Sequence, residues 1–229
     1  MNIAFWSEEG GCGTTSSMAA VASVCSDAWN MKTILLQSRN QEGDLWKKLG
    51  TVQKNRMVCK DNAYPALNGL DYLLWQAKNK RLTDAVMLDS MVPVVKERMY
   101  YLPQGRDTKS RVYPQSLKVS MCQIVRQAEQ LSDLTFIDCG SGKNELTDAL
   151  LAMSDIVVVS LPQNRSSLES YFVKKYIFSE KVVYLMNCYQ QDSACSRKDL
   201  TRLYRVREED LGVILYNPIF RHASDKGRT

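Results

Sequence analysis

The chain has 229 residues and a formal net charge of +5, and hydrophobic residues make up 45% of it against 24% charged residues. This length can build one large α/β domain or two small ones with a sizeable core, and the composition is ordinary for a soluble globular protein. The mild positive charge allows contact with nucleic acid or anionic lipid, but a solvated lysine-rich surface explains it as well.

Seven cysteines are spread along the chain without a C-x-x-C pair, and the one histidine, His222, has no cysteine at ligand spacing. This pattern argues against a zinc or iron–sulfur site and indicates a reducing compartment. The sequence begins without a basic leader, and none of its stretches approaches the ~20 apolar residues of a membrane span. We therefore expect a cytoplasmic protein without a membrane span.

Short apolar runs rich in β-branched and aromatic residues alternate with longer segments of helical spacing. In chain order, the predicted strands cover residues 3–6, 33–36, 99–102, 134–138, 156–160, 182–186 and 213–215. The predicted helices cover residues 15–29, 69–78, 115–131, 145–153, 166–178 and 198–203. This alternation predicts an α/β fold with a doubly wound, mostly parallel sheet of about seven strands. Residues 1–229 are expected to form a single domain, with the charged stretch 45–68 as an irregular, mobile excursion.

Three glycines, Gly10, Gly11 and Gly13, lie between the first predicted strand and the first predicted helix. Glycines let successive backbone N–H groups turn inward, and the start of a helix adds the positive end of its dipole. A strand, a glycine loop and a helix in this order can therefore cradle a phosphate. A glycine-rich turn that binds nothing has the same composition, so the loop alone leaves both interpretations open.

The segment 9–16 resembles the deviant Walker A loop of the MinD/ParA family, which normally reads Lys-Gly-Gly-x-Gly-Lys-Thr-Thr or Ser. Glu9 stands where that family has a lysine that reaches the partner's nucleotide, and Thr14 where it has the lysine that contacts the β and γ phosphates. Thr15 matches the hydroxyl ligand of Mg²⁺. The resemblance implies that nucleotide phosphates contact Gly10, Gly11, Cys12, Gly13, Thr14, Thr15 and Ser16.

The missing lysines predict binding with weak or no hydrolysis. Each lost charge-assisted contact is worth roughly 1.5–3 kcal/mol, and stabilising the transferring phosphoryl group is nearly all that such a site does. Ser38 and Asn40 occupy the places of two aspartates in the family's switch I segment. Because an amide cannot act as a carboxylate base, these substitutions weaken catalysis further.

Asp138 closes a hydrophobic strand and resembles the Walker B aspartate, which fixes Mg²⁺ through water. A turn or helix-cap aspartate is the alternative interpretation. The neighbouring Cys139 is expected to be a buried, inert thiol. Lys143 or Arg39 is the hypothesis for a cation that replaces the missing lysines, and Arg165 is a third candidate.

Two late segments resemble the family's base pocket. Asn187 stands in the place of the base-contacting asparagine, and Tyr216, Asn217 and Pro218 in the segment that walls the pocket. The ordered matches run from residue 3 to about residue 227. The chain stops just past this pocket segment, where relatives continue into further helices, so C-terminal helices of the domain are expected to lie outside this sequence.

The family consists of ATP-driven positioning proteins that dimerise around nucleotide, and a member without catalytic lysines looks most like the TadZ/CpaE group of Flp/Tad pilus assembly. The resemblance therefore implies ATP or ADP with Mg²⁺, a homodimer, and protein partners in a pilus, secretion or positioning system. It also implies recruitment to the cell pole or the inner membrane surface.

Two alternative functions stay open. One is an active ParA-like partition ATPase that binds DNA non-specifically through the basic run between Arg197 and Arg207. Nucleic acid is not favoured, because Glu208, Glu209 and Asp210 balance this run. The other alternative is a pseudo-ATPase that binds protein partners and no nucleotide. A related bacterial tyrosine kinase is disfavoured because both phosphate-binding lysines are missing.

Overall fold

The computed structural model describes residues 1–38, 45–49, 69–104, 114–174, 176, 178, 181–193 and 195–219. Its strands are β1 (Asn2–Ser7), β2 (Thr33–Gln37), β3 (Val92–Val95), β4 (Met99–Tyr101), β5 (Leu134–Ser141), β6 (Ile156–Leu161), β7 (Lys181–Tyr189) and β8 (Leu211–Leu215). Its helices are α1 (Thr14–Ala28), α2 (Leu45–Lys48), α4 (Leu70–Lys78), α5 (Asp84–Asp89), α6 (Pro114–Leu131), α7 (Glu145–Ala152), α8 (Arg165–Val173) and α9 (Arg197–Tyr204), with a 3₁₀ turn, η1 (Glu208–Asp210).

All eight strands form one sheet in the order β3-β4-β2-β5-β1-β6-β7-β8. Every neighbouring pair is parallel except β3 and β4, which are antiparallel. The predicted α/β fold with a mostly parallel sheet is therefore confirmed. The strand that the sequence pattern did not predict is β3, which carries Pro93. Proline lacks an N–H donor, and β3 tolerates it because β3 lies at the edge of the sheet.

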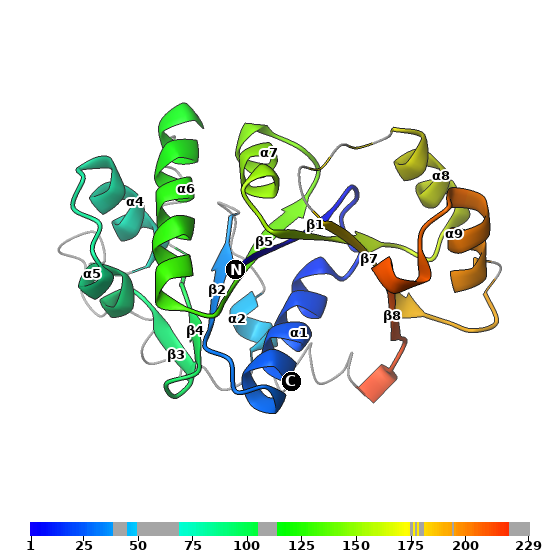
Figure 1. Ribbon diagram of the computed structural model, residues 1–229, viewed down its shortest axis with the longest axis horizontal. Coiled ribbons are helices and arrows are strands. Elements are labelled where there is room, and N and C mark those ends of the chain that lie inside the picture. Colours follow the sequence, from blue (N-terminus) through cyan, green and yellow to red (C-terminus); the bar gives the residue numbers. More distant parts are fainter. Residues whose placement is uncertain are drawn as a thin grey trace.

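Helices cover both faces of the sheet, as Figure 1 shows, with α1 and α2 on one face and α6, α7 and α8 on the other. All six residues of β1 are buried. Ala4 and Trp6 face the core beneath α6, α7 and α8, and Ile3 and Phe5 face the core beneath α1 and α2. Burial on both faces explains why the central strands lack a polar–apolar alternation.

Besides β3, three stretches differ from the elements expected from the sequence. The helix α5 was not predicted. The helix predicted at residues 166–178 ends at Val173, and Tyr176 and Phe178 pack their rings on Trp6 instead, at centroid distances of 5.2 and 6.0 Å. Within the stretch predicted to be irregular, Leu45–Lys48 forms α2, and residues 50–68 lie outside the described residues.

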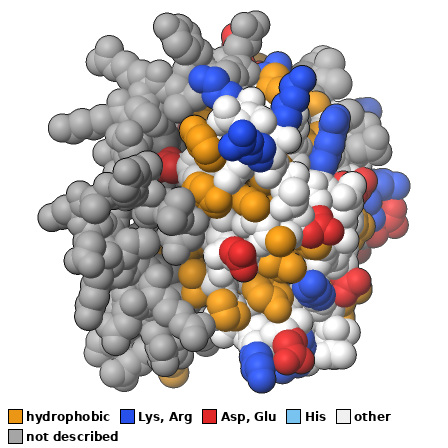
Figure 2. Space-filling view, turned by 90° about the vertical axis from the view of Figure 1, so that its left-hand side faces the viewer, with side chains coloured by type: hydrophobic (Ala, Val, Ile, Leu, Met, Phe, Trp, Pro, Cys, Tyr) orange, Lys and Arg blue, Asp and Glu red, His pale blue; other side chains and the backbone are white. Residues whose placement is uncertain are grey.

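Apolar side chains lie among charges of both signs on the side of the molecule that carries α4 and α5 (Figure 2). Trp75 on α4, Leu88 on α5 and Val119 on α6 are exposed, and Tyr72 stacks on Trp75. Such scattered apolar exposure is ordinary for a protein surface. No helix in the described part of the chain combines the length and the apolar character that a bilayer crossing requires.

The carboxyl ends of β1, β5 and β6 meet at one edge of the sheet, because β1 pairs with both of the other strands in parallel. The chain leaves β1 toward α1 on one face and leaves β5 and β6 toward α7 and α8 on the other (Figure 1). In parallel sheets, a reversal of this kind opens a crevice at the carboxyl edge, where ligands bind.

Candidate phosphate-binding site

The loop between β1 and α1 lies at this edge and leaves the start of α1 open. Gly11 and Gly13 have φ angles of 82° and 77°, in the left-handed region that favours glycine. Gly13 is the N-cap of α1, and no side chain caps the helix. The first N–H groups of a helix have no partner within it, so those of α1 are available to an anion.

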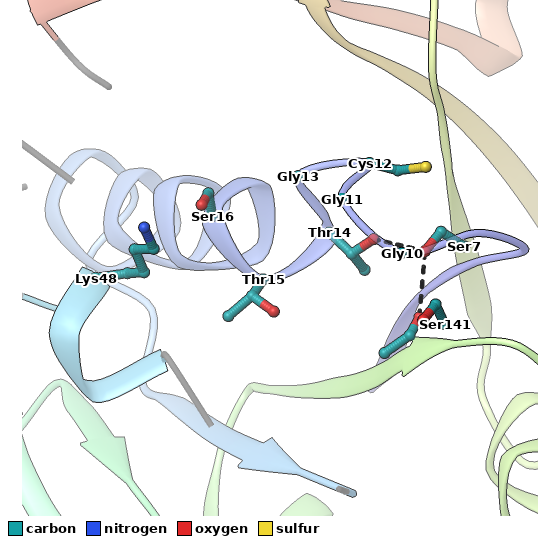
Figure 3. Close-up of a pocket in the computed structure, with 11 residues that line it drawn as sticks. Ser7, Gly10, Gly11, Cys12, Gly13, Thr14, Thr15, Ser16, Lys48 and Ser141 are labelled. Atoms are coloured by element: carbon teal, nitrogen blue, oxygen red, sulfur yellow. Dashed lines mark hydrogen bonds between the residues drawn. The ribbon is translucent and has the colours of Figure 1, made fainter. Parts of the chain in front are cut away.

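A cavity of about 280 Å³ adjoins this open helix end. Figure 3 shows its walls, which come from the loop, from the first turn of α1, from α2 and from the end of β5. The described residues that line it are Ser7, Gly10, Gly11, Cys12, Gly13, Thr14, Thr15, Ser16, Lys48, Gly140 and Ser141. The structure thus brings every predicted phosphate-contacting residue of the loop to one cavity.

Thr14, where the resemblance predicted a missing phosphate-binding lysine, is buried at the base of the loop. Its hydroxyl donates to Ser7 Oγ at 3.1 Å, and Ser7 Oγ donates to the carbonyl of Glu9 at 2.8 Å. The Glu9 carboxylate accepts a hydrogen bond from Ser167 Oγ on α8 at 2.9 Å. Neither position therefore brings a positive charge to the cavity.

Thr15 and Asp138 face each other across the end of the sheet. The Thr15 hydroxyl donates to Asp138 Oδ2 at 2.7 Å, and the backbone N–H of Gly140 donates to Oδ1 at 3.0 Å. Asp138 is only 1% exposed. A hydroxyl beside an oriented carboxylate fits Mg²⁺, which takes few protein ligands and keeps water and phosphate oxygens around it. The described residues contain no group of three or more His, Cys, Asp or Glu side chains placed to hold a metal.

Gln37, which the sequence analysis did not single out, belongs to this group. It lies directly opposite Asp138 in the β2–β5 pairing, and its Nε2 donates to Asp138 Oδ2 at 3.2 Å. Ser38 instead donates its hydroxyl to the backbone carbonyl of Asp138 at 3.0 Å. Gln37 could have been found as the polar residue that ends a buried strand beside the aspartate's strand. Asn40 lies outside the described residues.

Asn187 supports the loop from below. Its Nδ2 donates to the carbonyl of Cys12 at 2.7 Å, its Oδ1 accepts from Ser17 Oγ at 2.6 Å, and it is 6% exposed. A Cβ on Gly13 would lie 3.3 Å from the Asn187 Cβ, so the two residues are tightly packed. Contact with a nucleotide base stays a prediction for Asn187, because its amide would have to leave these two partners.

The segment predicted to wall the base pocket follows β8. Tyr216, Asn217 and Pro218 are exposed and are not among the described residues that line the cavity. The backbone N–H of Tyr216 donates to the carbonyl of Tyr189 at 3.0 Å, and Asn217 Oδ1 accepts from the N–H of Ile219 at 2.9 Å. These contacts fix the local turn, and the base-binding role of the segment stays a prediction.

The candidate replacement cations differ in their surroundings. Lys143 Nζ lies 3.5 Å from Asp148 Oδ1 and 4.6 Å from the centroid of the Tyr176 ring, and Arg165 pairs with Glu169 at 2.9 Å. Neither residue lines the cavity. Arg39 lies outside the described residues. Among the described residues, the charged one that lines the cavity is Lys48 on α2, which was not singled out from the sequence.

Two thiols lie at the site. Burial raises the pKa of Cys12, and the charge of Glu9 raises it further. Burial also raises the pKa of Cys139, with a second contribution from Asp138. Because a raised pKa keeps a thiol protonated at neutral pH, neither cysteine is suited to act as a nucleophile.

Two arginines of the basic run between Arg197 and Arg207 form ion pairs. Arg202 lies 3.8 Å from Asp199, and Arg207 lies 2.9 Å from Glu209 and 2.5 Å from Asp210. These pairs reduce the local positive charge that a nucleic-acid backbone would meet.

No model of a known protein family matches the sequence, and no curated protein sequence matches it. Solved structures do match the fold. A ParA family ATPase from Chlorobium tepidum superimposes with a TM-score of 0.76 at 13% identity, covering 99% of this chain and 90% of that one. The septum site-determining protein MinD from Pyrococcus horikoshii, complexed with Mg-ADP, gives a TM-score of 0.67 at 16% identity, covering 99% and 85%.

A protein from Borrelia burgdorferi assigned to plasmid partition, bound to AMPPNP, gives a TM-score of 0.70 at 12% identity, covering 100% of this chain and 90% of that one. At such low identities, these likenesses establish the fold alone. The chain therefore has the fold of the ParA/MinD ATPases over nearly its whole length.

Proposed function

We propose that the chain binds a nucleoside triphosphate with Mg²⁺ at the open end of α1 and hydrolyses it slowly or not at all. The observation that carries the proposal is the uncapped α1 N-terminus beside the pair formed by Thr15 and Asp138. Backbone N–H groups and the helix dipole favour the phosphates, and the two side chains supply the oxygens for the metal.

The residues around the site have distinct tasks in this proposal. The Thr15 hydroxyl would bind the metal directly, and Asp138 would accept hydrogen bonds from water on it. Gly140 and Gln37 hold the carboxylate in place through bonds of 3.0 and 3.2 Å. Bound Mg²⁺ supplies positive charge that neutralises the phosphate oxygens. Asn187 keeps the loop closed from below through Cys12.

Weak turnover is supported by what the cavity lacks. Its described lining contains no carboxylate that could act as a general base, and the loop has no lysine. Two lost charge-assisted contacts cost on the order of a hundredfold or more in rate. The negative charge of Glu9 at the start of the loop opposes phosphate charge instead of balancing it.

ATP or ADP is the proposed nucleotide, and the similar structures support this choice. The Pyrococcus horikoshii MinD was solved with Mg-ADP and the Borrelia burgdorferi protein with AMPPNP. We further take residues 1–229 as one P-loop NTPase-like domain, since strands from residue 2 to residue 215 share a single sheet.

A positioning or scaffold role is the biological part of the proposal. The role is supported by the fold shared with ParA and MinD. The resemblance to the TadZ/CpaE group extends the proposal to a Flp/Tad pilus or secretion system. It also extends the proposal to recruitment at the cell pole or the inner membrane surface. In this role the chain dimerises when it binds nucleotide and then recruits protein partners. A mass measurement with and without MgATP tests the dimer. DNA partition is not proposed, because Arg202 and Arg207 are paired with acids.

Calorimetric titration with MgATP, together with a phosphate-release assay, tests the proposal. We expect one binding site per chain and little or no phosphate release. Thr15→Val, which removes the hydroxyl and keeps the shape, should lose the dependence of binding on Mg²⁺. Rapid phosphate release would refute the weak-turnover part. Absence of MgATP binding would refute the proposed nucleotide site. The chain would then be a protein-binding pseudo-ATPase that uses no nucleotide.

A further inference from the structure

A charged residue lines the phosphate cavity from outside the loop. Of the described residues around the cavity, only Lys48 carries a charge. It belongs to α2, which lies far from the loop in the sequence and beside α1 in space (Figure 1). The site therefore receives a cation from a separate element.

The packing of α2 fixes where Lys48 lies. Leu45 and Leu49 are 0% and 7% exposed and belong to the core that also contains Met18 of α1. The backbone N–H of Leu49 donates to the carbonyl of Leu45 at 3.1 Å, so this turn is helical. Helical spacing places residues 45, 48 and 49 on one face. Lys48 therefore lies on the face of α2 that packs toward α1.

The side chain of Lys48 approaches one end of the cavity. Figure 3 shows it extending from α2 toward α1 on the side of Thr15 and Ser16, whereas Ser7 and Ser141 lie at the other end. Thr15 is paired with Asp138, the proposed metal side of the site. Thr15 and Asp138 would hold Mg²⁺, which would supply positive charge to the terminal phosphates of a bound triphosphate, so these phosphates would lie on the Thr15 side.

We infer that Lys48 pairs with the terminal phosphates of the nucleotide and supplies the positive charge that the loop lacks at Thr14. Lysine acts on phosphate as a point charge on a flexible stem, so it does not need to come from the loop itself. The inference rests on the proposed nucleotide binding and adds a preference between nucleotides. A cation at the terminal-phosphate end favours ATP over ADP.

Binding of MgATP and MgADP to four forms of the full chain tests this inference. Lys48→Met keeps the aliphatic stem and removes the charge, and Lys48→Arg keeps the charge. Lys143→Met is the matched control, since Lys143 does not line the cavity and lies beside Asp148 and the Tyr176 ring. Thermal melting of each form confirms that it is folded.

We expect Lys48→Met to weaken MgATP binding by about 10- to 100-fold, the size of a charge-assisted hydrogen bond, and MgADP binding by less. Lys48→Arg should bind MgATP within a few-fold of the wild type, as should Lys143→Met. Equal MgATP affinity of the wild type and Lys48→Met would overturn this inference alone. A loss of equal size in Lys143→Met would also overturn it. Failure of the wild type to bind either nucleotide would instead overturn the proposed function, and this inference with it.

Discussion

The helices α1, α7 and α8, which follow β1, β5 and β6, begin at the same edge of the sheet. Of these three, only α1 begins without a side-chain cap. Asn144 caps α7 by accepting from the N–H of Thr147 at 2.9 Å, and Asn164 caps α8 by accepting from the N–H of Ser166 at 2.9 Å. Gly13 at the start of α1 has no side chain to do this. All three helices direct a positive dipole end toward this edge. The N-cap residue decides which of them is left available for a phosphate.

The difference extends to the charges near each helix. The Glu9 carboxylate accepts from Ser167 in the first turn of α8, and Glu145 lies in the first turn of α7. The first turn of α1 contains no acidic residue. A carboxylate therefore lies near each of the two capped ends, whereas the first turn of α1 has none.

Blocking the open N-terminus of α1 should have the largest effect on MgATP binding. Gly13→Val places a β-branched residue at a φ of 77° and its Cβ 3.3 Å from that of Asn187. A left-handed conformation costs a non-glycine residue roughly 1–2 kcal/mol, and a β-branched residue more. We expect MgATP binding to fall below detection by calorimetry and the melting temperature to drop. Gly10→Ala is the control, since its Cβ would meet only Ser141 Oγ at an ordinary 3.7 Å. If Gly13→Val bound MgATP with wild-type affinity, the open end of α1 would not be the phosphate site.

Adding a cation to the open end should have the next largest effect. Thr14→Lys introduces the residue type that the resemblance to the MinD/ParA loop predicts at this position. One charge-assisted contact is worth roughly 1.5–3 kcal/mol, or about 10- to 100-fold in affinity. Thr14→Met loses the same bond to Ser7 without adding charge. Titration of both variants with MgATP should show a gain for the lysine variant only. Equal affinities would mean that charge at this position does not reach the phosphates.

Asn187→Ala should destabilise the loop between β1 and α1. It leaves the Cys12 carbonyl and the Ser17 hydroxyl without their partner, which costs about 1–3 kcal/mol for buried groups. We expect a lower melting temperature and weaker binding of both MgATP and pyrophosphate. Weaker MgATP binding with unchanged pyrophosphate binding and stability would instead identify Asn187 as the base-contacting residue that the sequence predicts.

Removing the two caps should have the smallest effect on binding. Asn144→Ala and Asn164→Ala each lose a helix cap, which costs about 0.5–2 kcal/mol of stability. Urea denaturation should detect this loss, and MgATP affinity should equal that of the wild type. A changed affinity in either variant would show that the open end of α1 is not the only helix end that matters.

Much of the fold could be predicted because it depends on local patterns. Runs of buried apolar residues identified the parallel strands, and the spacing of Gly10, Gly11 and Gly13 identified the open helix end. The strand β3 was missed because Pro93 is normally a signal against a strand, and only its edge position makes it acceptable.

The side chains around the loop were harder to predict, because their contacts depend on register and packing. Gln37 meets Asp138 through the pairing of β2 with β5, which no spacing along the chain reveals. Lys48 reaches the cavity because Leu45 and Leu49 pack α2 toward α1. Lys143, predicted from its place just after Asp138, lies instead beside Asp148 and the Tyr176 ring.

The claim that phosphate binds at the uncapped N-terminus of α1 can be tested by nuclear magnetic resonance. The measurement follows backbone amide shifts during a titration with MgATP. If the phosphates bind there, we expect large shifts for the N–H groups of Gly11, Gly13, Thr14, Thr15 and Ser16. We expect little change for the N–H groups of Thr147 in α7 and Ser166 in α8, which donate to their own N-cap residues. Shifts of similar size at all three helix ends, or none at α1, would contradict the claim.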